Sequence, residues 1–125
     1  MSDPERLEKG QKIIQQLEGG PAKNEVFSLM EEMFPDFWKM TQEHLYGSVW
    51  SSPVLSLRDR IIATLAVLTV LVCTDELKAT MRYALNNGIS REEILEIINH
   101  VKHYGGWPTG VNAIYAARSV LPPRE

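Results

Sequence analysis

Apolar residues recur every three or four positions along most of this 125-residue chain, which is the spacing of helices with one buried face. The stretch from Ile61 to Val72 differs, because it is apolar on all sides and should therefore be buried all round. It is shorter than the roughly 20 residues that a membrane span needs. We expect a core helix there. Before it, the residues that recur at helical spacing on related faces are Val26, Phe27, Met30, Met33, Phe37, Met40, His44 and Leu45.

Proline, glycine and capping residues mark where these helices begin and end. A first, polar helix should run from Pro4 to about Leu17, where Gly19-Gly20-Pro21 breaks it. The other boundary signals are starts at Asn24 and Pro35, a loop from Gly47 to Pro53, a capping box of Ser56 with Asp59, a cap at Thr74, a stop at Gly88, a capping box of Ser90 with Glu93, a stop at Gly105-Gly106 and a start at Pro108. The pattern lacks alternating strands and predicts an all-α fold of six or seven helices.

Length and composition narrow the functional classes. The chain suits one domain, which we expect at residues 21–125 behind a peripheral helical arm at residues 1–20. A net charge of -3 without a basic block disfavours a nucleic-acid partner. The single cysteine, Cys73, cannot form an internal disulfide, and the N-terminus MSDPERLEKG lacks an apolar signal segment. A cytoplasmic protein is therefore expected.

An all-apolar helix in so small a domain also affects the expected assembly. A chain of this length buries only about two-thirds of its unfolded surface by itself. Further apolar helix faces should therefore be covered by other copies of the chain, which predicts a homo-oligomer.

Three sequence fragments, in a fixed order, resemble a known family. They are L-Y-G-S-V-W-S-S-P at 45–53, L-S-L-R-D-R at 55–60 followed after the apolar helix by D-E-L-K and A-L-N-N-G, and H-V-K-H-Y-G-G-W-P-T-G-V-N-A at 100–113. From about Glu43 to Val120 the chain is similar to the carboxymuconolactone decarboxylase family of alkylhydroperoxidase D-like proteins. The resemblance implies a helical domain that forms trimers or hexamers, with active sites close to subunit contacts.

The departures from the family pattern concern its ionisable groups. Thr80 stands where the resemblance implies a histidine, Ile61 where it implies a glutamate, and Ser52 where it implies an arginine. A substrate with several carboxylates would lose charged hydrogen bonds worth roughly 1.5 to 3 kcal/mol each. In the peroxidase branch two cysteines do the redox work, but here Glu76 stands at the second position and Cys73 has no resolving thiol. A peroxidase cycle is therefore excluded.

The resemblance and the replacements predict a less polar cavity, suited to an aromatic or polyketide-like compound. Trp50, Tyr83 and Trp107 would supply flat walls, although ordinary core or interface packing is an alternative for each of them. The predicted substrate-binding residues are Trp50, Ile61, Cys73, Thr80, Tyr83 and Trp107.

Histidine and tyrosine residues supply new acid-base candidates. His103 directly precedes Tyr104, and His44 stands where relatives carry an apolar residue. A histidine exchanges a proton near neutral pH and a tyrosine hydroxyl polarises a carbonyl, so these three are the predicted catalytic residues. A surface or helix-capping histidine is the alternative. His100 resembles a family position and is expected to bond a neighbouring carbonyl.

No ligand spacing for a metal and no glycine-rich nucleotide motif occurs in the sequence, so we expect no cofactor. Two functions fit these observations. In the first, the protein is a cofactor-independent lyase or isomerase that decarboxylates, dehydrates or cyclises an apolar carbonyl, lactone or polyketide-type substrate in secondary metabolism. In the second, it is an inactive ligand-binding or scaffold homologue.

Overall fold

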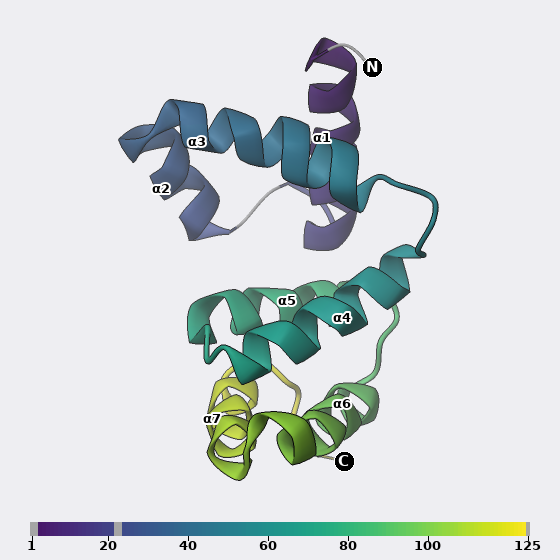
Figure 1. The fold of residues 1–125 in the computed structure, drawn as a ribbon, viewed down its shortest axis with the longest axis vertical. Helices are drawn as coiled ribbons and strands as arrows, with labels where there is room; N and C mark the ends of the chain where they lie inside the picture. The colour runs from purple at the N-terminus through teal and green to yellow at the C-terminus, as the bar shows by residue number, and fades with distance from the viewer. Residues whose placement is uncertain (1–2, 22–23, 125) are drawn as a thin grey trace. The chain divides into compact units, whose positions relative to one another are not determined.

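The computed structural model describes residues 3–21 and 24–124, and over these residues the chain forms seven α-helices, one π-helix and no strand. The predicted all-α fold is confirmed. The chain divides into two compact units, which we call unit 1 (residues 1–56) and unit 2 (residues 57–125) (Figure 1). The predicted boundary near residue 20 stays a prediction. Met1 and Ser2, which begin the predicted N-terminal segment, lie outside the described residues.

Unit 1 contains α1 (Asp3–Glu18), α2 (Glu25–Met33), α3 (Pro35–Met40) and the π-helix η1 (Thr41–Trp50). The Asn24 side chain accepts a hydrogen bond from the Val26 N–H, and Pro35 occupies the first turn of α3, so both predicted starts are confirmed. The predicted loop at Gly47 is wrong, because η1 continues through that glycine to Trp50.

Helices α1 and η1 cross at two glycines (Figure 1). A β-carbon at Gly10 would collide with the Gln42 carbonyl oxygen, and one at Gly47 would collide with the Arg6 carbonyl oxygen. The two helix backbones are therefore in direct contact, and only glycine permits that approach.

Unit 2 contains α4 (Leu57–Val70), α5 (Thr74–Asn86), α6 (Arg91–Gly105) and α7 (Trp107–Arg118). The predicted capping box of Ser90 and Glu93 is present at the start of α6, and Gly106 ends that helix with a φ of 106°. Pro108 lies in the first turn of α7, as predicted. The side chains buried deepest in this unit are Ile61, Leu65, Thr69, Leu77, Met81, Ile89 and Ile94.

One sequence expectation for unit 2 is wrong, and another stays a prediction. Within the chain α4 is buried on one face only, since Val67 and Val70 on its outer face are 54% and 40% exposed, and their burial against other copies of the chain stays a prediction. The residue that caps α5 is Cys73 and not Thr74, whose hydroxyl instead accepts a hydrogen bond from the Asn112 side chain at 3.2 Å. A hydrogen bond at Thr74 therefore links α5 to α7.

None of the described helices combines the length and the hydropathy that crossing a membrane requires.

Candidate functional site

Two neighbouring cavities form a continuous groove between α4 and α6 in unit 2, which we call the α4/α6 groove. Their volumes are about 420 and 360 Å³, and they share Ala66, His100 and Val101 as lining residues. Volumes of this size fall within the range of small-molecule sites. The remaining lining residues are Arg58, Ile62, Val67, Val70, Leu71, Ile89, Glu93, Glu96, Ile97 and Tyr104.

The two ends of this groove differ in polarity. At one end the lining consists of aliphatic residues with His100 and Tyr104. At the other end Arg58 and Glu93 form an ion pair. The Ser90 backbone N–H and then the Arg58 guanidinium lower the pKa of Glu93, so its carboxylate is held in the charged form. The groove therefore offers an apolar hollow that is open to solvent, which we call the apolar chamber, beside a charged rim formed by Arg58 and Glu93.

His100 and Tyr104 lie one turn apart on α6, and their rings are in contact. The ring centroids are 5.5 Å apart and the planes are tilted by 37°. Tyr104 is 83% exposed, so its hydroxyl is accessible from solvent. An imidazole that transfers a proton and a phenol that donates a hydrogen bond therefore share one wall of the apolar chamber.

His103, predicted to be catalytic beside Tyr104, lies on a different face of α6. Its Nδ1 atom is 2.8 Å from the Asn99 carbonyl oxygen, to which the Nδ1–H tautomer donates. Its ring lies edge-on to Trp107, with centroids 6.3 Å apart. Tyr104 lines the α4/α6 groove, whereas His103 is not among the residues that line it. The structure thus pairs Tyr104 with His100, while the predicted role of His103 stays a prediction.

His44 and Trp50, also predicted as site residues, belong to unit 1. His44 is exposed on η1. Trp50 is half-buried and stacks on Tyr46 at 5.9 Å, within an aromatic cluster that also holds Phe27 and Trp38. Burial, and secondarily the Glu18 carboxylate, raise the pKa of Tyr46 to about 12, so this phenol stays protonated. The roles predicted for His44 and Trp50 stay predictions.

The other predicted substrate-binding residues belong to unit 2. Ile61, Thr80 and Tyr83 are buried in its core, and the Thr80 hydroxyl donates to the Glu76 carbonyl at 2.9 Å. Cys73 is half-buried. Trp107 is exposed, with the Lys102 ammonium 3.7 Å from its ring centroid. The predicted role of each of these residues stays a prediction.

Sequence reasoning missed His100 as a candidate. A bond to a neighbouring carbonyl was expected for His100, but the structure gives that bond to His103. The signal for His100 was its position: it follows the apolar Ile97 by three residues, and Tyr104 follows it by four. Neighbouring residues of a helix point about 100° apart, so only packing shows which one meets the groove.

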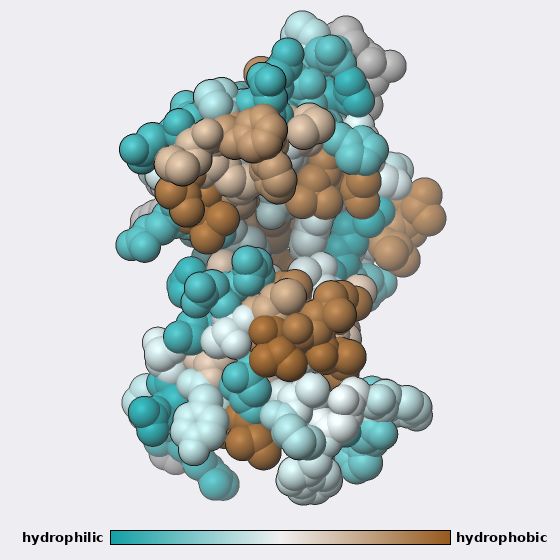
Figure 2. Space-filling model, turned by 60° about the vertical axis from the view of Figure 1, so that its left-hand side comes forward, coloured by the Kyte–Doolittle hydropathy of each residue, from teal (hydrophilic) through white to brown (hydrophobic). Residues whose placement is uncertain are grey.

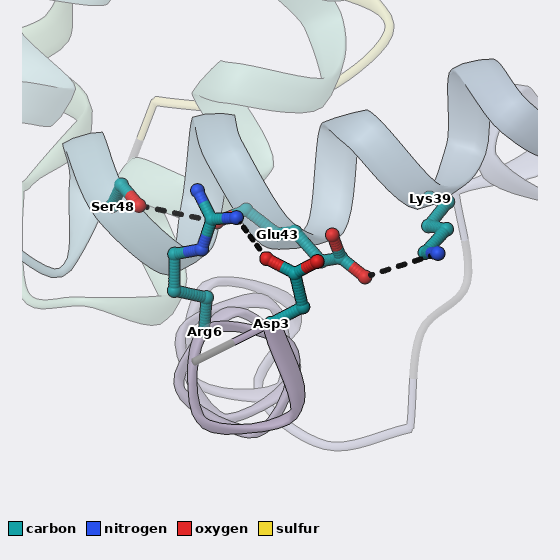
Figure 3. A network of polar contacts seen from close by, with 5 residues as sticks. All are labelled: Asp3, Arg6, Lys39, Glu43 and Ser48. Atoms are coloured by element: carbon teal, nitrogen blue, oxygen red, sulfur yellow. Dashed lines mark hydrogen bonds and ion pairs between the residues drawn. The ribbon is translucent and has the colours of Figure 1, made fainter. Parts of the chain in front are cut away.

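A polar network in unit 1 involves the start of α1, α3 and η1 (Figure 3). Arg6 pairs with Asp3, and Lys39 lies 4.0 Å from the Glu43 carboxylate. The Ser48 hydroxyl donates to the Glu43 carbonyl at 3.4 Å. Arg6, through a hydrogen bond and its charge, lowers the pKa of Asp3. These contacts satisfy charges beside the crossing of α1 and η1, and we interpret them as structural.

Over the described residues, His, Cys, Asp and Glu side chains form no group of three able to hold a metal ion.

Comparisons with known proteins identify the family. The family model of the carboxymuconolactone decarboxylase family matches residues 35–119, from the start of α3 through α7. A 4-carboxymuconolactone decarboxylase of Acinetobacter baylyi is 31% identical over 121 residues, which is 97% of this chain and 90% of the relative.

Two further relatives are more distant. A nitrosuccinic acid decarboxylase of Metarhizium robertsii is 29% identical over 66% of this chain and 58% of its own length. An uncharacterised 15.0 kDa protein of Paracoccus denitrificans is 28% identical over 77% of this chain and 73% of its own length. Two of the three relatives are decarboxylases, which supports a decarboxylase-type lyase at the family level. The chain belongs to the carboxymuconolactone decarboxylase family.

Proposed function

We propose that this protein is a cofactor-independent decarboxylase-type lyase that acts on a small, largely apolar carbonyl compound in the α4/α6 groove. One observation carries the proposal: His100 and Tyr104, with rings 5.5 Å apart, line the apolar chamber of that groove. Membership of a family with decarboxylase members supports the reaction class.

The reaction that suits this pair is loss of carbon dioxide from an acid with a carbonyl group β to its carboxylate. The bond between the carboxylate carbon and the α-carbon breaks, and its electron pair moves onto the carbonyl oxygen as an enolate. The Tyr104 hydroxyl donates a hydrogen bond to that oxygen, and protonated His100 then delivers a proton to the α-carbon. Water returns the proton to His100. The β-carbonyl group of the substrate accepts the electron pair, so this reaction needs no cofactor as an electron sink.

The surroundings favour an apolar substrate. Where another copy of the chain covers Val67, Val70 and Leu71, a carboxylate held beside them loses hydration, and this loss favours its conversion to neutral carbon dioxide. Aliphatic side chains supply most of the lining at the His100 end of this groove, which disfavours a substrate with several carboxylates. We therefore propose an aromatic or polyketide-type acid, as used in secondary metabolism.

Assembly and location form part of the same proposal. The exposed apolar residues of α4 would be covered by other copies of the chain in a trimer or hexamer. The single cysteine suits the reducing cytoplasm, where we place the enzyme.

The test is release of carbon dioxide from a series of β-keto acids with increasingly large apolar groups, using the purified protein. Replacing His100 with alanine should lower kcat by about 10²- to 10⁴-fold, the usual contribution of a general acid. Tyr104→Phe should lower kcat, because it removes the hydroxyl that stabilises the enolate and keeps the aromatic ring. His103→Ala is the matched control, because His103 lies on the same helix outside the groove, and it should retain activity.

Three outcomes would contradict the proposal. Full activity of His100→Ala with loss of activity in His103→Ala would return the catalytic role to His103. Binding of the acids without turnover by any variant would favour the inactive ligand-binding alternative. Rapid release of carbon dioxide from 4-carboxymuconolactone itself would contradict the proposal that substrates with several carboxylates are disfavoured.

A further inference from the structure

A second groove in unit 2 lies on the other side of α6, against α7, and we call it the α6/α7 groove. It consists of a cavity of about 710 Å³ and one of about 220 Å³, which share Leu95, Val111 and Ile114 as lining residues. Val111 and Ile114 are about half exposed. The proposed reaction uses none of these residues. Cavities of this volume with a mostly apolar lining are typical of ligand-binding sites.

The two helices that form this groove run antiparallel. At one end the Arg91 Nε–H donates to the Pro122 carbonyl at 2.8 Å, which joins the start of α6 to the segment after α7. At the other end a β-carbon on Gly110 would lie 2.8 Å from the Lys102 β-carbon. The start of α6 therefore lies beside the end of α7, and this arrangement places Arg91 and Arg118 at the same end of the groove.

These two arginines differ in what they already bind. Arg91 is engaged by the Pro122 carbonyl and by the Glu92 carboxylate at 2.9 Å. Arg118 is exposed and forms no ion pair with any described residue. A planar guanidinium with unused donors is suited to bind a carboxylate through two hydrogen bonds. Arg118 is therefore the cation available to a ligand at this end.

Away from the arginines the groove is apolar and long. From Arg91 to Lys102 the α6 wall spans eleven residue steps of 1.5 Å each, about 16 Å in total. The walls along this span are formed by Leu95, Ile98, Val111 and Ile114. At the far end the Lys102 ammonium lies over the Trp107 ring, 3.7 Å from its centroid, which places a flat surface there.

We propose that the α6/α7 groove binds an elongated monocarboxylic acid with an unbranched apolar body, taken up as the free acid from solution. The carboxylate pairs with Arg118, and the hydrocarbon body lies along the apolar walls toward Trp107. At one end Arg118 has unused donors, whereas at the other end the Lys102 ammonium is already placed over the Trp107 ring, so the groove complements a ligand with one anion at the end of a long apolar body. This site uses different residues from the α4/α6 groove and is independent of the reaction proposed there.

Dodecanoate, below the concentration at which it forms micelles, is the probe, and isothermal titration calorimetry on the full chain gives affinity and stoichiometry. We expect one molecule per chain and an affinity at least about tenfold weaker in Arg118→Gln, because a charged pair is lost. Ile114→Ser should also weaken binding, since it puts a hydroxyl in the apolar wall. Arg82→Gln is the matched control, because Arg82 is an exposed arginine on α5, and it should bind as the unmodified chain does.

Four results would overturn this inference. Equal binding of dodecyltrimethylammonium would remove the role of Arg118, and loss of binding in His100→Ala would move the ligand to the α4/α6 groove. A change of subunit number in Ile114→Ser, measured by sedimentation, would make this face an interface between copies of the chain. Cosedimentation with phosphatidylglycerol vesicles that is abolished by Arg118→Gln would replace the free acid with a lipid surface.

Discussion

The two grooves beside α6 share an apolar lining but differ in the polar groups that the lining holds. The α4/α6 groove contains the ring pair of His100 and Tyr104, whereas the α6/α7 groove ends at Arg118. An imidazole can move a proton, while a guanidinium stays charged and can only bind. Apolar area provides binding energy in both grooves, and one or two polar side chains decide whether chemistry follows. Apolar surface is also exposed on the face of the molecule in Figure 2.

The largest expected effect comes from combining a variant in each groove. His100→Ala should lower kcat by about 10²- to 10⁴-fold and leave the affinity for dodecanoate unchanged. Arg118→Gln should weaken dodecanoate binding by at least about tenfold and leave kcat unchanged. Because the two residues share no partner, the double variant should show the loss of kcat and the loss of affinity each at the size seen in the single variant, as additivity requires. Turnover assays and calorimetry on the same four proteins check this. A strong departure from additivity would show that the grooves act as one site.

A smaller effect is expected from the glycines that border the grooves. In Gly110→Ala the new methyl group meets the Lys102 β-carbon at 2.8 Å, which is fixed to the α6 backbone. Overpacking costs about 1–3 kcal/mol and should outweigh the roughly 1 kcal/mol gained when alanine replaces glycine in a helix. The free energy of unfolding, measured by urea denaturation, should therefore fall.

Gly105→Ala is the matched comparison on the other side of α6. There the new methyl group meets the Val70 Cγ2 atom at 2.6 Å, which is a side-chain end that can shift. We expect a smaller loss of stability than for Gly110→Ala. The reverse order would show that the α4/α6 groove is the more rigid of the two.

The capping box of α6 should affect both grooves alike. Ser90→Ala removes the hydroxyl that accepts from the Glu93 N–H, and loss of such a cap costs about 1 kcal/mol. The melting temperature should fall, while the ratio of turnover to dodecanoate affinity stays constant at temperatures where the protein is folded. A selective loss in one groove would mean that the start of α6 positions that groove alone.

The smallest effect concerns pH. The Ser90 N–H and Arg58 lower the pKa of Glu93 in the folded chain below its ordinary 4.5. The unfolded chain therefore binds the proton more tightly, so the stabilisation is complete above pH 4.5 and is lost as pH falls through the lowered value. Glu93→Gln should show a shallower loss of stability in acid, followed by circular dichroism. An acid profile identical to that of the unmodified chain would show that the charged form of Glu93 is not stabilised in the folded protein.

Local signals in the sequence determined the helices and the family. Asn24, Pro35, the Ser90 and Glu93 pair, and Gly106 act within a turn of their own position, so they could be interpreted without knowledge of the neighbours. The ordered motifs between Leu45 and Ala113 likewise indicated the family that the comparisons identify. The π-helical winding of Thr41–Trp50 had no such local signal, and it lies where η1 meets α1 at Gly10 and Gly47.

The tertiary structure decided which side chains share a surface. The sequence predicted a catalytic role for His103, which stays a prediction, while the structure shows the His103 ring beside the Asn99 carbonyl and His100 in the lining of the α4/α6 groove. Sequence also predicted that α4 would be buried all round, yet within the chain its outer face is exposed. Both outcomes depend on where other helices lie. The periodicity of a helix shows which residues share a face, but the direction of that face depends on contacts between residues distant in sequence.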